Sequence, residues 1–407
     1  MVRRRELLHG IAGLATYGVA SRSFARPRPL RVGVIGGGIV GASIARHLAQ
    51  AGAKVTLFEK SGPARGATEN SFAWVNAFET DPHYRSLRIQ SLLAYRDLDQ
   101  PLGLEMTWGG YANWANDAAG ADVVRSSAAQ LADTPYPVRS LEPADLAALS
   151  PALQPGPSTL AFFSPIDAHL NPVHVTRRFL DHASQQGAAV IYPCEVQTVD
   201  FRGPHLTGVR TSCGKFALDR LVVAAGVDTP RILAMAGFTL SLRHAPGILA
   251  HSVPLDPLTP VICDAPGGLS FKQMRDGSVV GTDALAPPDT PAHREILAAT
   301  KNFPDEALRS YHGNRILAKI GLFLPAARGV ALERLTLGFR PLPMDGYPVM
   351  GALPNSSDVH VAVTHSGVTL APIVGRYTSD EVLHGSRIEM LAPYRPERFP
   401  ATAVRAM

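Results

Sequence analysis

The sequence predicts a mixed α/β and α+β protein, in which a parallel sheet covered by helices adjoins an antiparallel sheet. Near the start, an apolar run, a helical pattern and a second apolar run follow one another over residues 30–58, the order of a parallel β-α-β unit. Segments of alternating apolar and polar character, at 105–114 and 278–282, are typical of antiparallel strands. The 407 residues exceed the length of about 250–300 at which a single core stops growing, so two structural parts are expected.

The composition is that of an ordinary globular protein, with 46% apolar and 18% charged residues. The formal net charge is +5, but the first 25 residues alone carry +3, since four arginines there face one glutamate. The remaining charge of about +2, without a basic stripe, is too small for a nucleic-acid surface. No nucleic-acid partner is therefore expected.

Residues 1–28 have the layout of a secretory signal peptide and its junction. A basic start precedes a moderately apolar stretch at 7–20, and small residues follow at Ser23 and Ala25. Arg4 and Arg5 resemble the twin-arginine export signal, which predicts a periplasmic or secreted protein; the alternative is a basic N-terminus retained in the cytoplasm. Neither this stretch nor any other approaches the roughly 20 apolar residues that a membrane helix needs, so no stable membrane span is expected.

A glycine-rich turn follows the first apolar strand, at 30–35. Gly36, Gly38 and Gly41 have the GxGxxG spacing, and an apolar helical pattern begins at once behind them. A second apolar strand comes next and closes with Glu59, 18 residues after Gly41. Strand, glycine turn, helix, second strand and terminal acid together are far more specific than the glycines alone.

Each part of this motif has a physical task in holding a dinucleotide. Gly36 permits the tight turn, Gly38 lets the backbone approach a pyrophosphate, and Gly41 lets the helix lie close to the strand. The free N–H groups and positive dipole of the helix N-terminus favour phosphate, while Glu59 accepts hydrogen bonds from ribose hydroxyls. A Rossmann-type site is predicted, for FAD or NAD rather than NADP. The predicted contacts here are Gly36, Gly38, Ile39, Val40, Gly41, Glu59 and Lys60.

The next segment, Gly66-Ala67-Thr68-Glu69-Asn70-Ser71, is not typical of NAD dehydrogenases. It resembles the Gly-Ala-(Ser/Thr)-x-x-Asn segment of the D-amino-acid oxidase / glycine oxidase / sarcosine oxidase (DAO) family. The resemblance implies a glutathione-reductase-like FAD domain with a parallel sheet, roofed by an antiparallel substrate domain. It also implies further cofactor contacts at Ala67, Thr68, Asn70, Ser71, Val196, Ala225 and Gly226.

The C-terminal part carries the resemblance further. The segment 338–351 begins Gly-Phe-Arg-Pro, and after a strand at 359–363 the chain reads Thr-His-Ser-Gly-Val-Thr before a helix. A glycine-bearing loop at a helix N-terminus can direct N–H groups at the flavin edge where negative charge collects on reduction. NAD enzymes have no use for this second anion site, so FAD is expected. The predicted contacts here are Ser366, Gly367, Val368 and Thr369.

These segments divide the chain. We expect the following parts: a signal peptide and junction at 1–28; an FAD-binding domain at 29–79, 151–235 and 335–390; a substrate domain at 80–150 and 236–334; and a C-terminal tail at 391–407.

Two side chains are the candidates for the chemistry. Arg340 resembles the family arginine that grips a substrate carboxylate, a bidentate geometry that lysine does not copy; the alternative is an arginine that ties its loop to the core. His365 lies beside the expected flavin and orients substrate or polarises the flavin, or else packs the loop. Trp74 and Asn76 are candidates to line the ring face.

The sequence departs from the family pattern in two respects. Sarcosine-oxidase relatives attach FAD through a cysteine near the Gly-x-Arg-Pro segment, and none occurs at 335–351, so noncovalent FAD is expected. Those relatives also carry an oxygen-activating lysine at the position of Val279. Lys272 or Arg275 could supply that charge, and the electron acceptor is either oxygen or a quinone-type carrier.

The three cysteines, Cys194, Cys213 and Cys263, have no metal-type or CxxC spacing. We expect them to be buried small hydrophobes without a disulfide, and we expect no metal site.

The sequence therefore predicts an FAD-dependent amine or amino-acid oxidase or dehydrogenase. It removes a hydride from the carbon next to nitrogen of a D-amino acid, glycine or N-alkyl glycine, giving an imine that hydrolyses. Two alternatives remain: a flavin enzyme that oxidises a hydroxy acid or other carboxylated substrate, and a noncatalytic flavin-binding protein.

Overall fold

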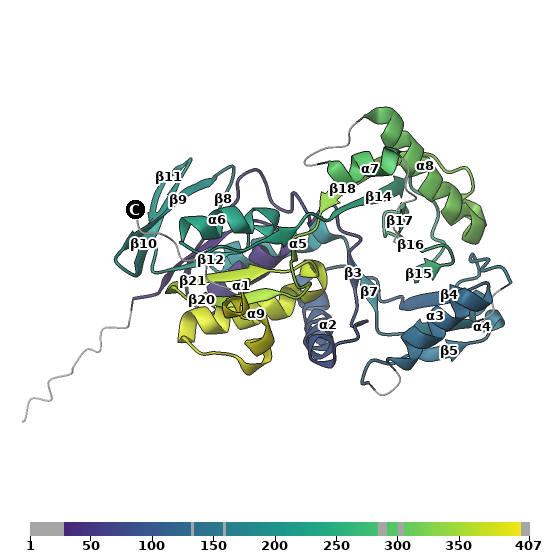
Figure 1. The fold of residues 1–407 in the computed structure, drawn as a ribbon, viewed down its shortest axis with the longest axis horizontal. Helices are drawn as coiled ribbons and strands as arrows, with labels where there is room; N and C mark the ends of the chain where they lie inside the picture. The colour runs from purple at the N-terminus through teal and green to yellow at the C-terminus, as the bar shows by residue number, and fades with distance from the viewer. Residues whose placement is uncertain (1–27, 132–133, 158–159, 284–290, 300–304, 400–407) are drawn as a thin grey trace, which may run out of the picture.

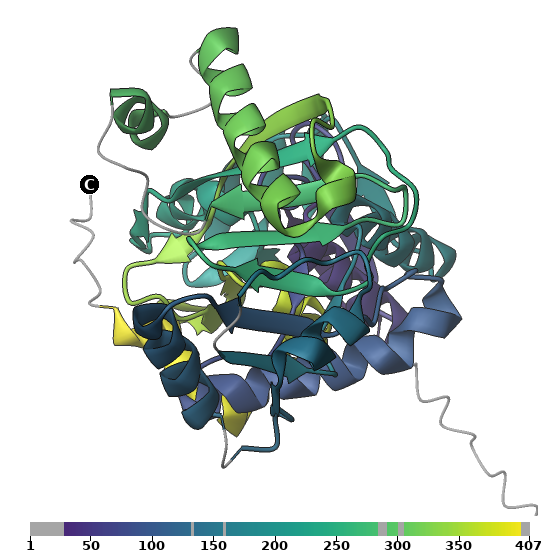
Figure 2. The same cartoon turned by 90° about the vertical axis from the view of Figure 1, so that its right-hand side faces the viewer.

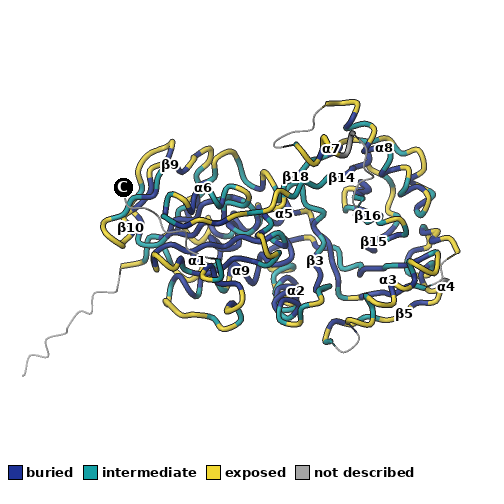
Figure 3. The backbone as a smooth tube through the Cα atoms, viewed as in Figure 1, coloured by how far each residue is buried: buried dark blue, intermediate teal, exposed yellow. Residues whose placement is uncertain are grey.

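The computed structural model describes residues 28–131, 134–157, 160–283, 291–299 and 305–399. It contains two large sheets side by side, each with its own helices (Figure 1). Buried residues follow the strands of both sheets, and the exposed residues lie mainly on outer helix faces and loops (Figure 3). This arrangement confirms the predicted combination of a parallel-sheet domain with an antiparallel one.

The first sheet has six strands in the order β20-β21-β12-β1-β2-β8, parallel except that β20 runs antiparallel to β21. Its strands are β1 (Arg31–Ile35), β2 (Lys54–Phe58), β8 (Ala189–Ile191), β12 (Arg220–Val223), β20 (Val349–Leu353) and β21 (Ser356–Val363). Residues far apart in sequence thus meet in one sheet.

Three helices pack together on this sheet: α1 (Ile39–Gln50), α5 (Pro172–Gln185) and α9 (Gly367–His384). The predicted apolar face of α5 is buried, and Asn171 caps the helix by accepting hydrogen bonds from two backbone N–H groups. Parallel strands need such cover on their faces, which explains why their sequences are continuous apolar runs.

The second sheet has eight strands in the order β18-β14-β17-β16-β15-β4-β6-β5, antiparallel except for the pair β4–β15. Helix α8 (Glu306–Phe323) crosses one face of this sheet (Figure 2). The strands are β4 (Tyr111–Ala115), β5 (Arg139–Leu141), β6 (Leu160–Ser164), β14 (Pro246–Ser252), β15 (Ile262–Ala265), β16 (Leu269–Gln273), β17 (Val279–Asp283) and β18 (Leu332–Phe339).

Smaller elements complete the described chain. A three-stranded meander and two short ribbons, one of which (β3–β7) lies between the two large sheets, accompany the remaining helices (Figure 1). These elements are β3 (Trp74–Val75), α2 (Pro82–Leu102), α3 (Ala118–Ala129), α4 (Pro143–Leu149), β7 (Ala168–His169), β9 (Val196–Arg202), β10 (His205–Thr211), β11 (Gly214–Ala217), η1 (Gly226–Asp228), α6 (Thr229–Met235), β13 (Leu242–Arg243), α7 (Pro291–Ala298), η2 (Pro325–Ala327), β19 (Leu342–Pro343), η3 (Glu389–Tyr394) and η4 (Pro396–Arg398).

The strand expected at 105–114 is shorter than predicted, since regular pairing in β4 starts only at Tyr111. Two glycines interrupt the alternating pattern. A Cβ atom on Gly109 would lie 1.9 Å from the Pro260 carbonyl oxygen, and Gly110 has a φ of +77°. The close backbone approach and the left-handed turn break the strand there.

The expectation that the cysteines form no disulfide is wrong. Cys194 and Cys213 are bonded, with their Cα atoms 5.6 Å apart. The meander β9-β10-β11 folds back on itself, so residues 19 apart in sequence meet across it. Cys263, in contrast, is buried without a disulfide, as expected.

The signal peptide was predicted for a segment of which residues 1–27 lie outside the described residues, and the boundaries of the predicted domains remain a prediction. No helix in the described ranges is long and apolar enough to cross a membrane.

The disulfide predicts a specific thiol count and a stability difference. Denatured protein should show one reactive thiol without reductant and all 3 cysteines after reduction, measured with a thiol-reactive dye. Replacing Cys194 and Cys213 together by Ala should lower the free energy of unfolding by roughly 3 kcal/mol, as expected for a loop of this length. Reductant should lower the melting temperature of the natural protein but not of the double variant. Three thiols in the unreduced natural protein would contradict the pairing.

Candidate functional site

The turn between β1 and α1 brings backbone atoms so close together that only glycine fits. A Cβ atom on Gly36 would lie 2.3 Å from the Ala224 carbonyl oxygen, and one on Gly41 would lie 2.0 Å from the Gly36 carbonyl oxygen. Gly36 also has a φ of +113°. The first turn of α1 therefore sits directly over the ends of β1 and β12, with its N–H groups free of intrahelical partners.

Glu59, at the end of β2, holds the neighbouring loop. Its carboxylate accepts hydrogen bonds from the N–H groups of Gly37 at 2.7 Å and of Ser61 at 2.9 Å. Lys60, the next residue, forms an ion pair with Asp228. The acid thus stands beside the glycine turn, where the sequence predicted a ribose contact.

A cavity of about 190 Å³ lies over this turn. Most of the predicted contacts line it, whereas Gly36 and Gly41 lie outside its lining and Val196 is buried at the start of β9. The predicted residues in its lining are Gly38, Ile39, Val40, Glu59, Lys60, Ala67, Thr68, Ser71, Ala225, Gly226, Gly367 and Val368.

A second and larger cavity, of about 560 Å³, adjoins the first. The two cavities share five lining residues, so they adjoin one another, the smaller beside the glycine turn and the larger beside the antiparallel sheet. The shared residues are Ala67, Ser71, Pro341, His365 and Val368. The predicted residues Asn70, Ser366 and Thr369, together with Arg340, line only the larger cavity.

The N-terminus of α9 faces this space from the far end of the sequence. Ser366 is the N-cap, and Gly367, Val368 and Thr369 form the first turn, whose N–H groups have no acceptors within the helix. The Thr369 hydroxyl donates to the Trp74 carbonyl oxygen at 2.9 Å, which fixes this turn against the loop that follows β2. The positive end of the α9 dipole is therefore aimed at the junction of the two cavities.

These features fit an FAD molecule. The smaller cavity combines a helix N-terminus with the Glu59 carboxylate, as a pyrophosphate and a ribose require. The larger cavity has room for a flat ring system beside a second helix N-terminus, and it is lined partly by Phe72, Ala73 and Trp74. Contact of any single predicted residue with FAD stays a prediction.

Arg340 and His365, the two candidates for the chemistry, both line the larger cavity. The Arg340 backbone N–H donates to the Ala245 carbonyl oxygen at 3.0 Å, and its side chain is exposed and makes no ion pair within the described part of the chain. Burial lowers the pKa of His365 to about 4, and the positive charges of Arg88 and Arg340 add to this effect. His365 is therefore neutral at physiological pH, beside two guanidinium groups.

Three further charged residues that line this cavity were not predicted from the sequence: Arg88, Asp283 and Arg315. Arg88, on α2, is only 8% exposed and pairs with Glu79. Arg315 of α8 pairs with Asp283 at the end of β17, where Lys319 also binds at 3.0 Å. A helical arginine carries no motif, so only the packing of α2 and α8 around the cavity reveals these charges.

Three positions were considered for an oxygen-activating charge, and they lie in different places in the structure. Val279 is fully buried in the core of the antiparallel sheet, away from the larger cavity. Lys272 is buried behind the cavity wall, with Nζ 3.4 Å from the Ala73 carbonyl oxygen and above the Phe72 ring, and burial lowers its pKa to about 7. Arg275 is exposed.

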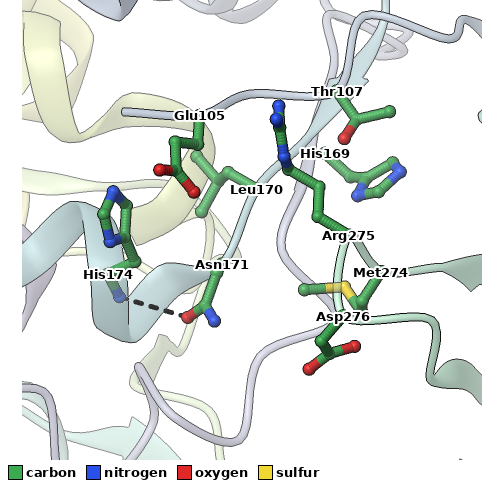
Figure 4. Close-up of a pocket in the computed structure, with 9 residues that line it drawn as sticks. All are labelled: Glu105, Thr107, His169, Leu170, Asn171, His174, Met274, Arg275 and Asp276. Carbon is green, nitrogen blue, oxygen red and sulfur yellow. Dashed lines mark hydrogen bonds between the residues drawn. The ribbon is translucent and has the colours of Figure 1, made fainter. Parts of the chain in front are cut away.

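Arg275 lines a different cavity, of about 340 Å³ (Figure 4). Its lining includes Leu170 and His169, which is 1% exposed. The Leu170 N–H donates to the carbonyl oxygen of Ala73, whose residue lines the larger cavity, so one layer of chain separates the two spaces. No cluster of potential metal ligands occurs within the residues that the structure describes.

Residues 31–381 match the family model described as "DAO: FAD dependent oxidoreductase". Human mitochondrial dimethylglycine dehydrogenase is 24% identical over 384 residues, which are 90% of this chain and 44% of that protein, so the chain spans less than half of that relative. Glycine oxidase of Geobacillus kaustophilus is 24% identical over 376 residues, 89% of this chain and 95% of that protein.

Solved structures share the fold. The crystal structure of glycine oxidase from Geobacillus kaustophilus has a TM-score of 0.79 at 22% identity and covers 91% of this chain and 100% of its own. The crystal structure of L-proline dehydrogenase from P. horikoshii has the same TM-score and identity, with coverages of 92% and 98%.

The glycine turn predicts a matched pair of variants. Gly38→Ala would place a Cβ atom 3.1 Å from the Thr68 hydroxyl, in the space that a pyrophosphate would fill, and should weaken FAD retention by tenfold or more, about 1.4 kcal/mol. Gly62→Ala, whose Cβ atom would meet nothing closer than 3.9 Å, should retain FAD normally. Flavin release on dilution, followed by fluorescence, measures both. Equal retention would contradict the placement of the pyrophosphate.

Proposed function

The chain belongs to the DAO family of FAD dependent oxidoreductases, and we propose on this premise that it oxidises a small amine or amino acid that carries a carboxylate. The substrate would lose a hydride from the carbon next to nitrogen. The nitrogen lone pair forms the C=N bond, the nitrogen releases a proton, and water then hydrolyses the imine to a carbonyl compound and an amine. FAD, when bound, accepts the hydride.

Arg340 is the observation that carries this proposal. Its guanidinium group lines the larger cavity and has no ion-pair partner in the described part of the chain, whereas Arg88 and Arg315 are each paired with an acid. An unpaired planar cation beside a cavity is suited to bidentate binding of a carboxylate. Such an anchor would hold the rest of the substrate toward the N-terminus of α9.

The neutral state of His365 supports the same reaction. Hydride removal from an amine carbon requires a neutral amine, because an ammonium group has no lone pair to form the C=N bond. A ring with a pKa near 4 adds no further positive charge above that pH and can still accept a hydrogen bond from the amine N–H. We assign His365 the orientation of the substrate nitrogen.

Noncovalent FAD is part of this proposal. Cys194 and Cys213 are joined to each other, and Cys263 is buried in the core of the antiparallel sheet. None of the three cysteines lines either cavity, which supports a cofactor held without a thioether bond.

The electron acceptor would be oxygen or a quinone-type carrier. Lys272 supports the first option, because its buried ammonium group contacts the carbonyl of Ala73 at the cavity wall. Peroxide release in air, compared between the natural protein and Lys272→Met, distinguishes the options. Loss of peroxide with unchanged anaerobic flavin reduction supports oxygen, and reoxidation by a soluble quinone alone supports the carrier.

Export to an oxidising compartment is also proposed. The signal-like layout of residues 1–28 is one support, and the Cys194–Cys213 disulfide is a second and independent one, because such bonds persist mainly outside the cytoplasm. A twin-arginine route carries folded proteins, which suits a chain that must first bind FAD.

A substrate panel tests the proposed reaction. Anaerobic bleaching of the flavin absorbance by an amino acid or N-alkyl amino acid is the expected result. Bleaching by hydroxy acids alone would instead support oxidation of a C–OH centre, and the absence of any bleaching would indicate a noncatalytic flavin protein.

Arg340→Ala should raise the dissociation constant of a carboxylated substrate roughly a hundredfold, about 3 kcal/mol, because two charge-assisted hydrogen bonds are lost. FAD should remain bound. Arg334→Ala, which removes an exposed arginine from β18, the strand just before Arg340, outside the cavity, is the matched control and should bind substrate normally. Substrate titration followed by the flavin absorbance gives both constants. Unchanged affinity in Arg340→Ala would show that Arg340 does not anchor the substrate carboxylate.

Export is tested with residues 1–30 fused to a reporter enzyme. Replacing Arg4 and Arg5 by Lys should abolish appearance of the reporter outside the cytoplasm, since the twin-arginine route reads the arginine pair. A fusion with Arg22→Lys should still be exported. Export of the double-lysine fusion would exclude this route.

A further inference from the structure

Trp74 is a wall of the larger cavity and is held from several sides. Its carbonyl oxygen accepts the Thr369 hydroxyl from the first turn of α9, and its backbone pairs with His169 in the β3–β7 ribbon. The indole ring lies against the ring of Tyr111, with centroids 4.4 Å apart. The orientation of the indole ring also depends on the group that binds its Nε1 atom.

That partner is Asp167, which is fully buried. The Trp74 Nε1–H donates to Oδ2 of Asp167 at 2.6 Å. The other carboxylate oxygen accepts hydrogen bonds from the hydroxyl of Tyr136 and from the hydroxyl of Ser164, the latter at 2.9 Å. Three donors from three separate segments therefore converge on one carboxyl group that does not line the cavity itself.

A second buried acid supports the neighbouring ring. Asp264 accepts the hydroxyl of Tyr111 at 2.6 Å and also that of Ser270. The charged or titratable groups that act on the Asp167 network are Tyr136, Tyr111 with Asp264, and Arg88, whose positive charge favours the ionised form of Asp167. The two rings thus rest on two carboxyl groups in the interior.

We propose that Asp167 is a positioning residue for the oxidation: its carboxylate fixes the indole of Trp74 as a wall of the substrate cavity, and protonation of the carboxyl group loosens that wall. The inference rests on the proposed function in taking the larger cavity as the place where substrate binds. The link between Asp167 and Trp74 itself is independent of the substrate.

The effect of protonation follows from the number of hydrogen-bond donors that surround the Asp167 carboxyl group. An ionised carboxylate accepts from all three groups, whereas an indole N–H donates only and a protonated carboxyl adds a donor of its own. Protonation also removes the negative charge that strengthens these hydrogen bonds, so the bond from Trp74 weakens. Burial raises the pKa of Asp167 to about 7, and the hydrogen bonds from Tyr136, Ser164 and Trp74 oppose this effect. The change therefore falls near neutral pH.

Fluorine NMR of protein labelled with 5-fluorotryptophan tests this link without substrate. The chain has 3 tryptophans, and the resonance absent from Trp74→Phe identifies Trp74. It should shift with pH with a midpoint near 7. The resonance of Trp114 serves as an internal control, because its Nε1–H donates to the Pro155 carbonyl oxygen, which does not titrate.

Two variants assign the titration. Asp167→Asn should abolish the shift of the Trp74 resonance. Tyr136→Phe removes a hydrogen bond that stabilises the carboxylate, so the midpoint should move to higher pH. Tyr377→Phe, which loses a hydroxyl that donates to Gln90 away from this network, should leave the midpoint in place. If Asp167→Asn fails to fold, Ser164→Ala serves instead and should also raise the midpoint.

The acid limb of kcat/KM provides the functional readout. In Tyr136→Phe it should move to higher pH together with the NMR midpoint, and Asp167→Asn should lower kcat/KM by about tenfold or more, the effect of one lost charged hydrogen bond. A Trp74 resonance that does not titrate, or that still titrates in Asp167→Asn, would overturn the inference. So would an acid limb that stays in place while the NMR midpoint moves. A titrating Trp74 in a protein that oxidises no amine would leave the link intact and remove only the proposed reaction.

Discussion

The close approach of backbones at the first strand–helix turn is the constraint on which the rest of the site depends. Gly36 lies against the carbonyl of Ala224, and Gly41 lies against the carbonyl of Gly36. A methyl group at either place would separate α1 from the sheet. The free N–H groups of the first turn of α1 would then no longer lie over the strand ends. The parallel sheet with α1 packed on it forms the cofactor platform. Its geometry depends on two glycines, which have no side chain.

The second anion-binding turn depends on the same platform. Strand β21 pairs with β12, which pairs with β1, so the chain that leaves β21 enters α9 beside the start of α1. Thr369 then ties this turn to Trp74, and Trp74 rests on groups from the antiparallel sheet. A continuous series of contacts therefore connects the cofactor platform with the walls of the substrate cavity.

Much of the platform could be predicted from the sequence, because its parts are local. Strand, turn and helix around Gly36 are predicted from about thirty consecutive residues, and the helix after Ser366 is predicted from its glycine and its apolar pattern. The disulfide could not be predicted, since pairing of Cys194 with Cys213 depends on how a meander folds back. Arg88 and Asp167 were missed for a similar reason: one is a charge within a long helix, and the other is a buried acid for which two of the three donors, on Trp74 and Tyr136, come from distant segments. The irregular start of β4 is decided by Pro260, nearly 150 residues away.

Three cations from separate parts of the chain line the larger cavity: Arg88 on α2, Arg315 on α8 and Arg340 just after β18. Arg88 and Arg315 are balanced in part by Glu79 and Asp283, but Lys319 shares the same Asp283 and Arg340 is balanced by no described acid. A surplus of positive charge beside a cavity accelerates the diffusional arrival of anions, and this effect declines as ionic strength rises. Molecules with a negative group would therefore reach the interior more often than neutral molecules of the same size, before any contact is made.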